Sequence, residues 1–431
     1  MAGPIILGDI TQIALGFIDS VMVGAIHSTR LAAASLVMNV LAIPYVMGIG
    51  VTFSISPLVA RSRGQGHYGR PAHILFNGFV LCGIVAFLLA LLIHLNAGIV
   101  FHLGQDPVVA QLARPYLIVM GWSTLPMLLF LGLKQFSDAL EYTRVGMVIS
   151  LSAIPVNFCL NWILIYGHFG MPRYELLGAG IGTLISRCLV LVALLLVIVR
   201  HRVFADYRRR WTSTARLRWK TMKALIRIGI PSSLQYGMEA GAFAFSGIMI
   251  GWLGATQQAA HQIAISLATL TYHVSLGFSA AGAIRVAHAY GQKDQAALRK
   301  IGYSTLRISF LWGALCALMF ILLKSRLPFL FNDEAPVVAA ASVLLVIAAV
   351  FQVSDSMQAV SVGLLRGLHD VRMPTFLVVI AYWVIGLPVG YWLAFPLHLQ
   401  SAGIWIGLTI GLTASATLLG FRFSRSVQKK V

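Results

Sequence analysis

Long apolar runs separated by short polar segments dominate the hydropathy pattern of this chain. Most runs extend over ~20 residues, the length at which an α-helix crosses the hydrocarbon core of a bilayer. Strands of a membrane barrel would instead alternate apolar and polar residues over about ten positions. The pattern therefore predicts an all-α fold with twelve membrane-spanning helices, at about residues 4–25, 33–58, 74–101, 114–137, 143–165, 176–200, 225–252, 258–287, 303–331, 336–365, 373–396 and 401–423.

The composition places the chain among integral membrane proteins. Of its 431 residues 58% are hydrophobic and 10% are charged, whereas a soluble domain carries about 25% charged residues. The 32 lysines and arginines outnumber the 13 acids, an excess that can indicate nucleic-acid binding. However, the basic residues lie between the apolar runs and lack the interleaved aromatic residues of a base-stacking surface. We therefore expect contact with membrane lipid and no nucleic-acid partner.

The basic residues also predict how the helices are oriented. Loops after the even-numbered spans, together with the C-terminus, carry 25 Lys and Arg, whereas loops after the odd-numbered spans carry five. Cytoplasmic loops are enriched in Lys and Arg, so both termini are expected in the cytoplasm. The densest basic stretch separates two predicted lobes, 1–200 and 225–431, joined by a cytoplasmic linker at 201–224. We expect this linker to contact anionic lipid, with a protein-docking site as the alternative.

The two halves of the chain repeat one another. A shift of 227 positions places Tyr45 on Tyr272, and Gly64-Gln65 on Gly291-Gln292. Each half contains six predicted spans, so both halves enter the membrane in the same sense and are related by a pseudo-two-fold axis along its normal. Two like bundles that rock about a central cavity are typical of transporters, although the repeat does not identify the cargo.

Acidic side chains inside the spans are the first candidates for function. There are four of them, namely Asp9, Asp19, Glu239 and Asp355. A charge near the middle of the membrane costs about 2.5–3.5 kcal/mol, so each needs a partner, a water-filled cavity or a proton. Hydrogen bonding between helices is the simpler role, but uncharged groups would provide it at lower cost. We therefore expect Asp19, Glu239 and Asp355 to be functional.

The fifth span adds Asn157 and Asn161, which lie one helical turn apart. Two amides at this spacing can face a carboxylate or a cation together, or can simply join two helices. A carboxylate in a low dielectric can exchange a proton near neutral pH, and one that stays ionised among oxygen ligands can hold Na⁺. Because such an ion and an organic cation would compete for the same negative charge, these residues indicate antiport.

Five strings of residues carry a resemblance to a known family. They are Phe17 to Gly24, Pro155 to Asn161, Pro231 to Glu239, Ala260 to Ala264, and Asp355 to Gly367. With the duplicated twelve-span pattern, they make the chain resemble the multidrug and toxic compound extrusion (MATE) family, specifically its bacterial NorM-type branch, over essentially its whole length. The resemblance implies a MATE fold of two pseudo-symmetric six-helix bundles and cation-driven export of organic, mostly cationic drugs.

Transferred by motif, the resemblance also implies particular sites. A cation site in the first lobe would consist of Asp19, Asn157 and Asn161. A second cation site, typical of the NorM-type branch, would consist of Glu239, Asp355 and Tyr272, with Glu239 and Asp355 as the ligands if the ion is Na⁺. Substrate would be contacted by Gln262, Asp333 and Glu334. For the last two residues, which lie in an external loop, simple solvation is the alternative.

We thus expect a multidrug efflux antiporter that is coupled to Na⁺ or H⁺ and uses no cofactor. The alternative is a flippase for lipid-linked oligosaccharides, which would need arginines in its cavity to bind pyrophosphate. Lys134, Arg187 and Arg366 are too few for this role and lie too near the ends of the spans. An enzyme or a receptor is not expected, since no P-loop, HExxH or nucleophile-and-base motif occurs. We further expect a monomer in the bacterial inner membrane. The first span begins almost at Met1, which leaves an upstream segment open.

Overall fold

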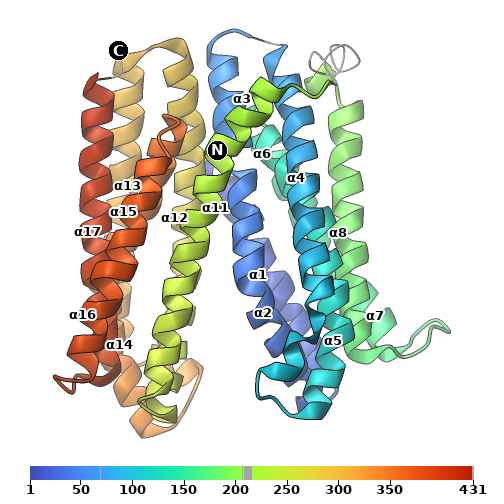
Figure 1. The fold of residues 1–431 in the computed structure, drawn as a ribbon, viewed down its shortest axis with the longest axis vertical. Helices are drawn as coiled ribbons and strands as arrows, with labels where there is room; N and C mark the ends of the chain where they lie inside the picture. Colours follow the sequence, from blue (N-terminus) through green and yellow to red (C-terminus); the bar gives the residue numbers. More distant parts are fainter. Residues whose placement is uncertain (68, 206, 208–215, 430–431) are drawn as a thin grey trace. The chain divides into compact units, whose positions relative to one another are not determined.

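The structure, a computed structural model, describes residues 1–67, 69–205, 207 and 216–429 (Figure 1). Within this part of the chain every regular element is a helix and no strand occurs. The predicted all-α membrane fold is therefore confirmed. Apart from the first two residues, the chain divides by its internal contacts into two compact units, which are residues 3–233 (unit 1) and 234–431 (unit 2).

Unit 1 is built from helices that pack pairwise. They are α1 (Ala2–Gly24), α2 (Ser28–Thr52), α3 (Ile55–Gly64), α4 (Arg70–Leu95), η1 (Ala97–His102), α5 (Pro107–Trp122), α6 (Thr124–Ala139), α7 (Thr143–Tyr166), α8 (Glu175–Arg200) and η2 (Arg202–Phe204). α7 packs on α8, α4 on α6, and α2 on α5. α2 and α3 together form one apolar span, as do α5 and α6.

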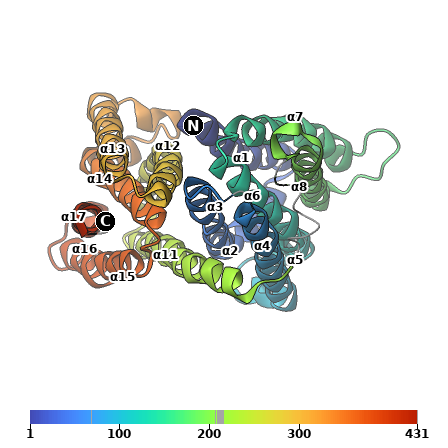
Figure 2. The same cartoon turned by 90° about the horizontal axis from the view of Figure 1, so that it is seen from above.

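Unit 2 is arranged around α14. Its elements are α11 (Trp219–Gly251), which begins in unit 1, α12 (Ala255–Gln292), α13 (Gln295–Leu323), η3 (Leu327–Leu330), α14 (Ala335–Gly367), α15 (Arg372–Val379), η4 (Ile380–Gly386), α16 (Leu387–Ala394) and α17 (Gln400–Lys429). α14 packs against α12, α13 and α17, as Figure 2 shows from above. η4 is a π-helix that joins α15 and α16 into one span.

Eleven helical segments of the described chain are long and apolar enough to cross a membrane. The predicted seventh span corresponds to α11, which has 33 residues and is not among them. The reason lies in its sequence, because Gln235 and Glu239 interrupt its apolar run. The predicted fourth span, 114–137, is longer than expected and extends over Pro107–Ala139. Its predicted end at residue 137 excluded Asp138, which in fact lies in α6.

The two units repeat the same order of elements. The start of α2 at Ser28 corresponds to the start of α12 at Ala255, which is the offset of 227 seen in the sequence. Later elements follow with small changes of offset, since α5 begins at Pro107 and α14 at Ala335. The short helices η1 and η3 precede α5 and α14 in the same way. The duplication predicted from the sequence therefore extends to the order of the helices.

Glycines bring two helices of unit 2 into backbone contact. A side-chain carbon at Gly407 of α17 would lie 2.3 Å from Cα of Gly390 in α16, and one at Gly411 would lie 2.3 Å from the carbonyl oxygen of Ala381. Small residues at helix interfaces are typical of membrane proteins, because lipid provides little force to press helices together and close backbone approach provides the packing. The contact fixes η4 and α16 against α17.

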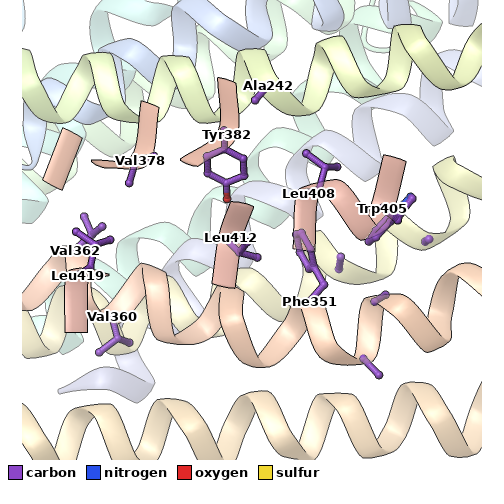
Figure 3. Packing of buried hydrophobic residues seen from close by; sticks show 14 of the residues in the cluster. Ala242, Phe351, Val360, Val362, Val378, Tyr382, Trp405, Leu408, Leu412 and Leu419 are labelled. Atoms are coloured by element: carbon purple, nitrogen blue, oxygen red, sulfur yellow. The ribbon is translucent and has the colours of Figure 1, made fainter. Parts of the chain in front are cut away.

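The core of unit 2 surrounds η4. Its fully buried side chains include Tyr382, Trp405 and Phe351. In Figure 3 the Tyr382 ring lies between the helix that carries Ala242, which is α11, and the helix that carries Val360, which is α14. Phe243 packs edge-on against this ring, with centroids 5.6 Å apart. The phenol of Tyr382 therefore lies in the core between α11, which carries Glu239, and α14, which carries Asp355.

The predicted linker at 201–224 falls partly on residues 206 and 208–215, which lie outside the described part of the chain. Its described end belongs to α11, which begins at Trp219. Near this end, Asn77 of α4 donates its amide to the carbonyl oxygen of Arg216 over 3.3 Å and accepts from the backbone N–H of Arg218 over 3.0 Å. The start of α11 is thereby attached to unit 1.

Candidate cation sites

The first predicted site forms around Asp19 in unit 1. Asn161 Nδ2 of α7 donates to Asp19 Oδ1 over 2.5 Å and to Asn157 Oδ1 over 3.3 Å. The structure thus brings all three predicted residues together across α1 and α7. Asn157 and Asn161 are 1% and 0% exposed, so their amides have no alternative in water.

Thr183 of α8 completes this site, although the sequence analysis did not select it. Its hydroxyl donates to Asp19 Oδ2 over 3.0 Å, and Asn157 Nδ2 donates to the same hydroxyl over 3.4 Å. Both oxygens of Asp19 therefore receive a donor. A threonine inside an apolar span is common and carries no signal of its own. The signal that could have identified it is Arg187, which lies one turn later on the same face of α8.

Arg187 is held in place by neutral partners. Its Nη1 donates to Ser123 Oγ over 2.6 Å and to the Tyr45 hydroxyl over 3.3 Å, and its guanidinium lies 5.3 Å from the centre of the Tyr45 ring. Tyr45 in turn donates its hydroxyl to the carbonyl oxygen of Met120 over 2.9 Å. These contacts hold the guanidinium between Tyr45 of α2 and Ser123, the residue that follows α5. No ion pair within 4 Å joins Arg187 to an acid in the described chain.

The second predicted site forms around Glu239 in unit 2. Gln358 Nε2 of α14 donates to Glu239 Oε1 over 3.1 Å, and the Tyr382 hydroxyl donates to the same oxygen over 3.3 Å. Gln358 Nε2 also lies 3.4 Å from the Tyr382 hydroxyl. Glu239 is 7% exposed and the other two are almost fully buried. Residues from α11, α14 and η4 therefore meet at one carboxylate.

Asp355 lies on α14 one turn before Gln358 and is 4% exposed. Within the described residues its carboxylate makes no hydrogen bond and no ion pair. Two further polar atoms on the same helix, Gln352 Nε2 and Gln358 Oε1, are buried without a hydrogen-bond partner among the described residues. Glu239 Oε1 accepts twice, whereas its second oxygen accepts nothing from the described side chains. The described side chains therefore provide no basic partner for either carboxylate, and no donor for Asp355 or for the second oxygen of Glu239.

Tyr382, not selected from the sequence, provides the phenol that contacts Glu239. The predicted Tyr272 of α12 is partly buried and interacts electrostatically with Glu239 and Asp355, but it donates no hydrogen bond among the described residues. Tyr382 was missed because its direction depends on the π-helical geometry of η4, which the apolar sequence around it does not announce. π-Helical turns are frequent at functional sites.

The oxygen atoms around Glu239 are a partial set of ligands for a monovalent cation. Two carboxylates, the free oxygen of Gln358 and the Tyr382 hydroxyl are of the type that Na⁺ accepts. In the part of the chain that the structure describes, no group of three or more His, Cys, Asp or Glu residues is arranged to hold a metal ion. Any ion bound here would therefore depend on the amide and hydroxyl oxygens as much as on the acids.

The three predicted substrate contacts are exposed. Gln262 of α12 donates Nε2 to Ser266 Oγ over 3.4 Å in its own helix. Glu334 is the N-cap residue of α14, and its backbone N–H donates to Asn332 Oδ1 over 2.6 Å. Asp333 precedes it in the same exposed loop. No described contact joins Gln262 to this acidic pair.

Comparison with known proteins gives one family and one fold. The family model described as MatE matches residues 4–163 and 231–392, which is one segment in each half of the chain. A structure of the eukaryotic MATE transporter AtDTX14 is 22% identical, with a TM-score of 0.89 over 100% of this chain and 96% of that one.

Two further structures share the fold. A MOP superfamily transporter from Pyrococcus furiosus, whose binding pocket is described as reversed in polarity and suggestive of a different function, is 18% identical, with a TM-score of 0.89 over 100% of this chain and 95% of that one. The Vibrio cholerae MATE transporter VcmN, in its bent form, is 17% identical, with a TM-score of 0.87 over 100% and 96% of the two chains. At these identities the likeness establishes the fold.

Proposed function

The chain belongs to the MatE family, and we propose on this basis that it is a secondary active efflux antiporter. It exports organic, mostly cationic compounds in exchange for Na⁺ or H⁺. One observation supports this most strongly. Glu239 and Asp355 are both buried in unit 2, and neither forms an ion pair with a described basic residue. Buried negative charge without a partner is costly, so the site requires a positive ion from outside.

Two kinds of cation can meet that requirement. A proton or Na⁺ neutralises the carboxylates directly, and an organic cation can do so through its own charge. If the two exclude one another, each lowers the apparent affinity for the other by the same factor. Binding of the inorganic ion on one side of the membrane then favours release of the organic cation there. This reciprocal exclusion is the proposed basis of antiport.

The site around Asp19 differs from that around Glu239. Both Asp19 oxygens already receive hydrogen bonds, from Asn161 and Thr183. We assign it a second cation-coupling role, as the resemblance implies. We also propose that Gln262, Asp333 and Glu334 contact substrate, since all three are exposed and two of them are acids that attract organic cations. Tyr272 is retained as a proposed member of the Glu239 site.

The alternative function, a flippase for lipid-linked oligosaccharides, needs positive charge that is free to bind pyrophosphate. Lys134 is tied to Asp9 over 2.9 Å, and Arg187 is tied to Ser123 and Tyr45. These contacts favour antiport over the flippase. The remaining features of the proposal are a monomer in the bacterial inner membrane and cytoplasmic termini. The position of the termini is supported by the distribution of basic residues.

Dye transport by proteoliposomes tests the proposal. Purified protein is reconstituted with ethidium, and a sodium gradient and a pH gradient are imposed in separate experiments. At least one gradient should drive ethidium movement, and Glu239→Gln and Asp355→Asn should each abolish it. Asp294→Asn is the matched control, because this exposed acid caps α13 by accepting from the N–H of Ala297, which asparagine does equally well.

Two outcomes would contradict the proposal. Undiminished gradient-driven transport in both variants would remove the coupling site from Glu239 and Asp355. Translocation of a lipid-linked oligosaccharide by protein that moves no dye under either gradient would favour the flippase.

A further inference from the structure

A second set of buried charges lies in unit 1, apart from both sites described above. Lys134 Nζ of α6 lies 2.9 Å from Asp9 Oδ1 of α1, and 3.7 Å from Asp138 Oδ2 one turn later in α6. Lys134 and Asp138 are 5% and 3% exposed. Asp9 was predicted to lie inside a span, and the structure identifies Lys134 as its partner. One lysine thus joins α1 to the end of α6.

Glycines on both neighbouring helices make room for this lysine. A side-chain carbon at Gly8 of α1 would lie 3.3 Å from Lys134 Cε, and one at Gly146 of α7 would lie 3.1 Å from Lys134 Cγ. Both distances are tighter than ordinary contact, so any larger residue would press on the lysine. The Lys134 side chain is therefore packed between Gly8 of α1 and Gly146 of α7, and its amine extends from there to the two acids.

The charges of this network do not balance. One positive charge faces two carboxylates, and Asp138 Oδ1 is buried without a hydrogen-bond partner among the described residues. The elements packed on α6 are α2, α3, α4, α5, α7 and α8. Of the described charged side chains, Lys134 and Asp9 are those that interact electrostatically with Asp138. Arg63 of α3 also approaches this end of α6, but it donates to the Leu140 carbonyl oxygen over 3.1 Å and pairs with the exposed Glu141.

We propose that Asp138 binds one proton at Oδ1 when Asp9 is docked on Lys134, and releases it when α1 leaves. With the proton in place, Asp138 is neutral and Lys134 pairs with Asp9 alone. Without Asp9, Lys134 pairs with an ionised Asp138, and no proton is needed. A metal ion is a poor alternative, because it requires several oxygen ligands and Asp138 Oδ1 has no hydrogen-bond partner among the residues that the structure describes. The buried network is neutral in both states.

This exchange links the position of α1 to pH. Because docking takes up one proton, the docking equilibrium weakens by up to about tenfold for each pH unit above the titration range. α1 also carries Asp19, which lies ten residues beyond Asp9, or about 15 Å along the helix. No proline separates the two acids, so a movement at one is transmitted to the other. The inference concerns α1 alone and does not depend on the proposed cargo.

Amide hydrogen exchange of α1 tests the link. Protection of the peptide that covers residues 2–24 is measured against pH in the wild type, in Asp138→Asn and in Asp106→Asn, after correction for intrinsic exchange. Wild-type protection should fall as pH rises, by up to about tenfold per unit. Asp138→Asn, which is neutral at every pH, should keep α1 protected throughout. Asp106 is an exposed N-cap acid of α5, so Asp106→Asn should follow the wild type.

Infrared spectroscopy gives a second readout that a merely structural role would not change. In difference spectra between the wild type and each variant, bands of other protonated acids such as Glu239 and Asp355 cancel. The wild type should then show one carbonyl band of a protonated carboxylic acid that is absent in Asp138→Asn. The same band should be absent in Asp9→Asn, because Lys134 then pairs with an ionised Asp138. If Asp138→Asn fails to fold, Asp9→Asn decides whether Asp138 is the protonated acid. A band that persists in Asp9→Asn, or an α1 whose protection does not vary with pH in the wild type, would overturn the proposal.

Discussion

Replacing Gly407 by alanine tests how the packing of unit 2 supports the Glu239 site. Gly407 lies in α17, where it contacts the backbone of α16 and the end of η4. η4 carries Tyr382, whose hydroxyl donates to Glu239 over 3.3 Å. If the helices are forced apart, the phenol should move away from the carboxylate. Gly407→Ala should therefore lower both stability and transport.

The size of the effect follows from the geometry. An alanine Cβ at 407 would lie 2.3 Å from both Cα and N of Gly390, and 2.6 Å from the carbonyl oxygen of Gly386. Carbon atoms in contact prefer about 3.5–4.0 Å, so the helices must separate by roughly 1 Å or more. All three neighbours are main-chain atoms, so no change of rotamer can relieve the overlap. Such overpacking costs about 1–3 kcal/mol, which exceeds the gain of up to about 1 kcal/mol in helix propensity.

Thermal unfolding and dye efflux together measure this prediction. A net loss of roughly 1–2 kcal/mol corresponds to an unfolding temperature lower by about 2–8 °C for a domain of this size. The hydroxyl of Tyr382 already lies near the limit of hydrogen bonding, so a shift of about 1 Å breaks that bond and efflux should fall as well.

Gly420→Ala is the control on the same helix. There a Cβ would meet only Ser361 Oγ, at 4.0 Å, and stability should be unchanged or slightly higher. If Gly407→Ala matches Gly420→Ala in both measurements, the reasoning is refuted.

Two further substitutions examine single hydrogen bonds at the two sites. Thr183→Val keeps the volume but removes the donor to Asp19, and because bonds to charged groups contribute about 1.5–3 kcal/mol, chemical unfolding in detergent should show a loss of that order. Thr417→Val, which removes only a bond to the helix's own backbone, should show a clearly smaller loss, and equal losses would count against the Asp19 contact. Tyr382→Phe keeps the ring packing and removes the donor to Glu239, so gradient-driven efflux should fall by up to about tenfold with little change in unfolding temperature; wild-type efflux would show that the phenol has no part in coupling.

The sequence was sufficient for those features that depend on local pattern. Apolar runs of spanning length predicted the helices, and the offset repeat predicted two like units. The family resemblance implied the grouping of Asp19 with Asn157 and Asn161, whereas the spacing showed only that the two amides share a face of α7 that can meet an acid or another helix.

The residues that the sequence did not reveal are those whose role depends on another helix. Thr183 is an ordinary residue of an apolar span until α8 brings it against Asp19. Tyr382 lies in a π-helix and contacts Glu239 from there, and the hydropathy pattern did not predict that local geometry. Asp138 was placed just beyond a span, since an uncertainty of one residue at the helix end separates a buried acid from a loop acid. Without Asp138 inside the span, nothing in the sequence indicated that Lys134 pairs with a buried acid.

Competition between cations on the purified protein tests directly whether an inorganic ion and an organic cation exclude one another at Glu239 and Asp355. The affinity for ethidium is measured at equilibrium while Na⁺ is raised at constant pH, and again while pH is lowered without Na⁺. At least one of these ions should displace ethidium from the wild type, and Glu239→Gln and Asp355→Asn should abolish the displacement. Ethidium binding that neither ion affects in the wild type, or displacement that persists in both variants, would contradict the proposed exclusion.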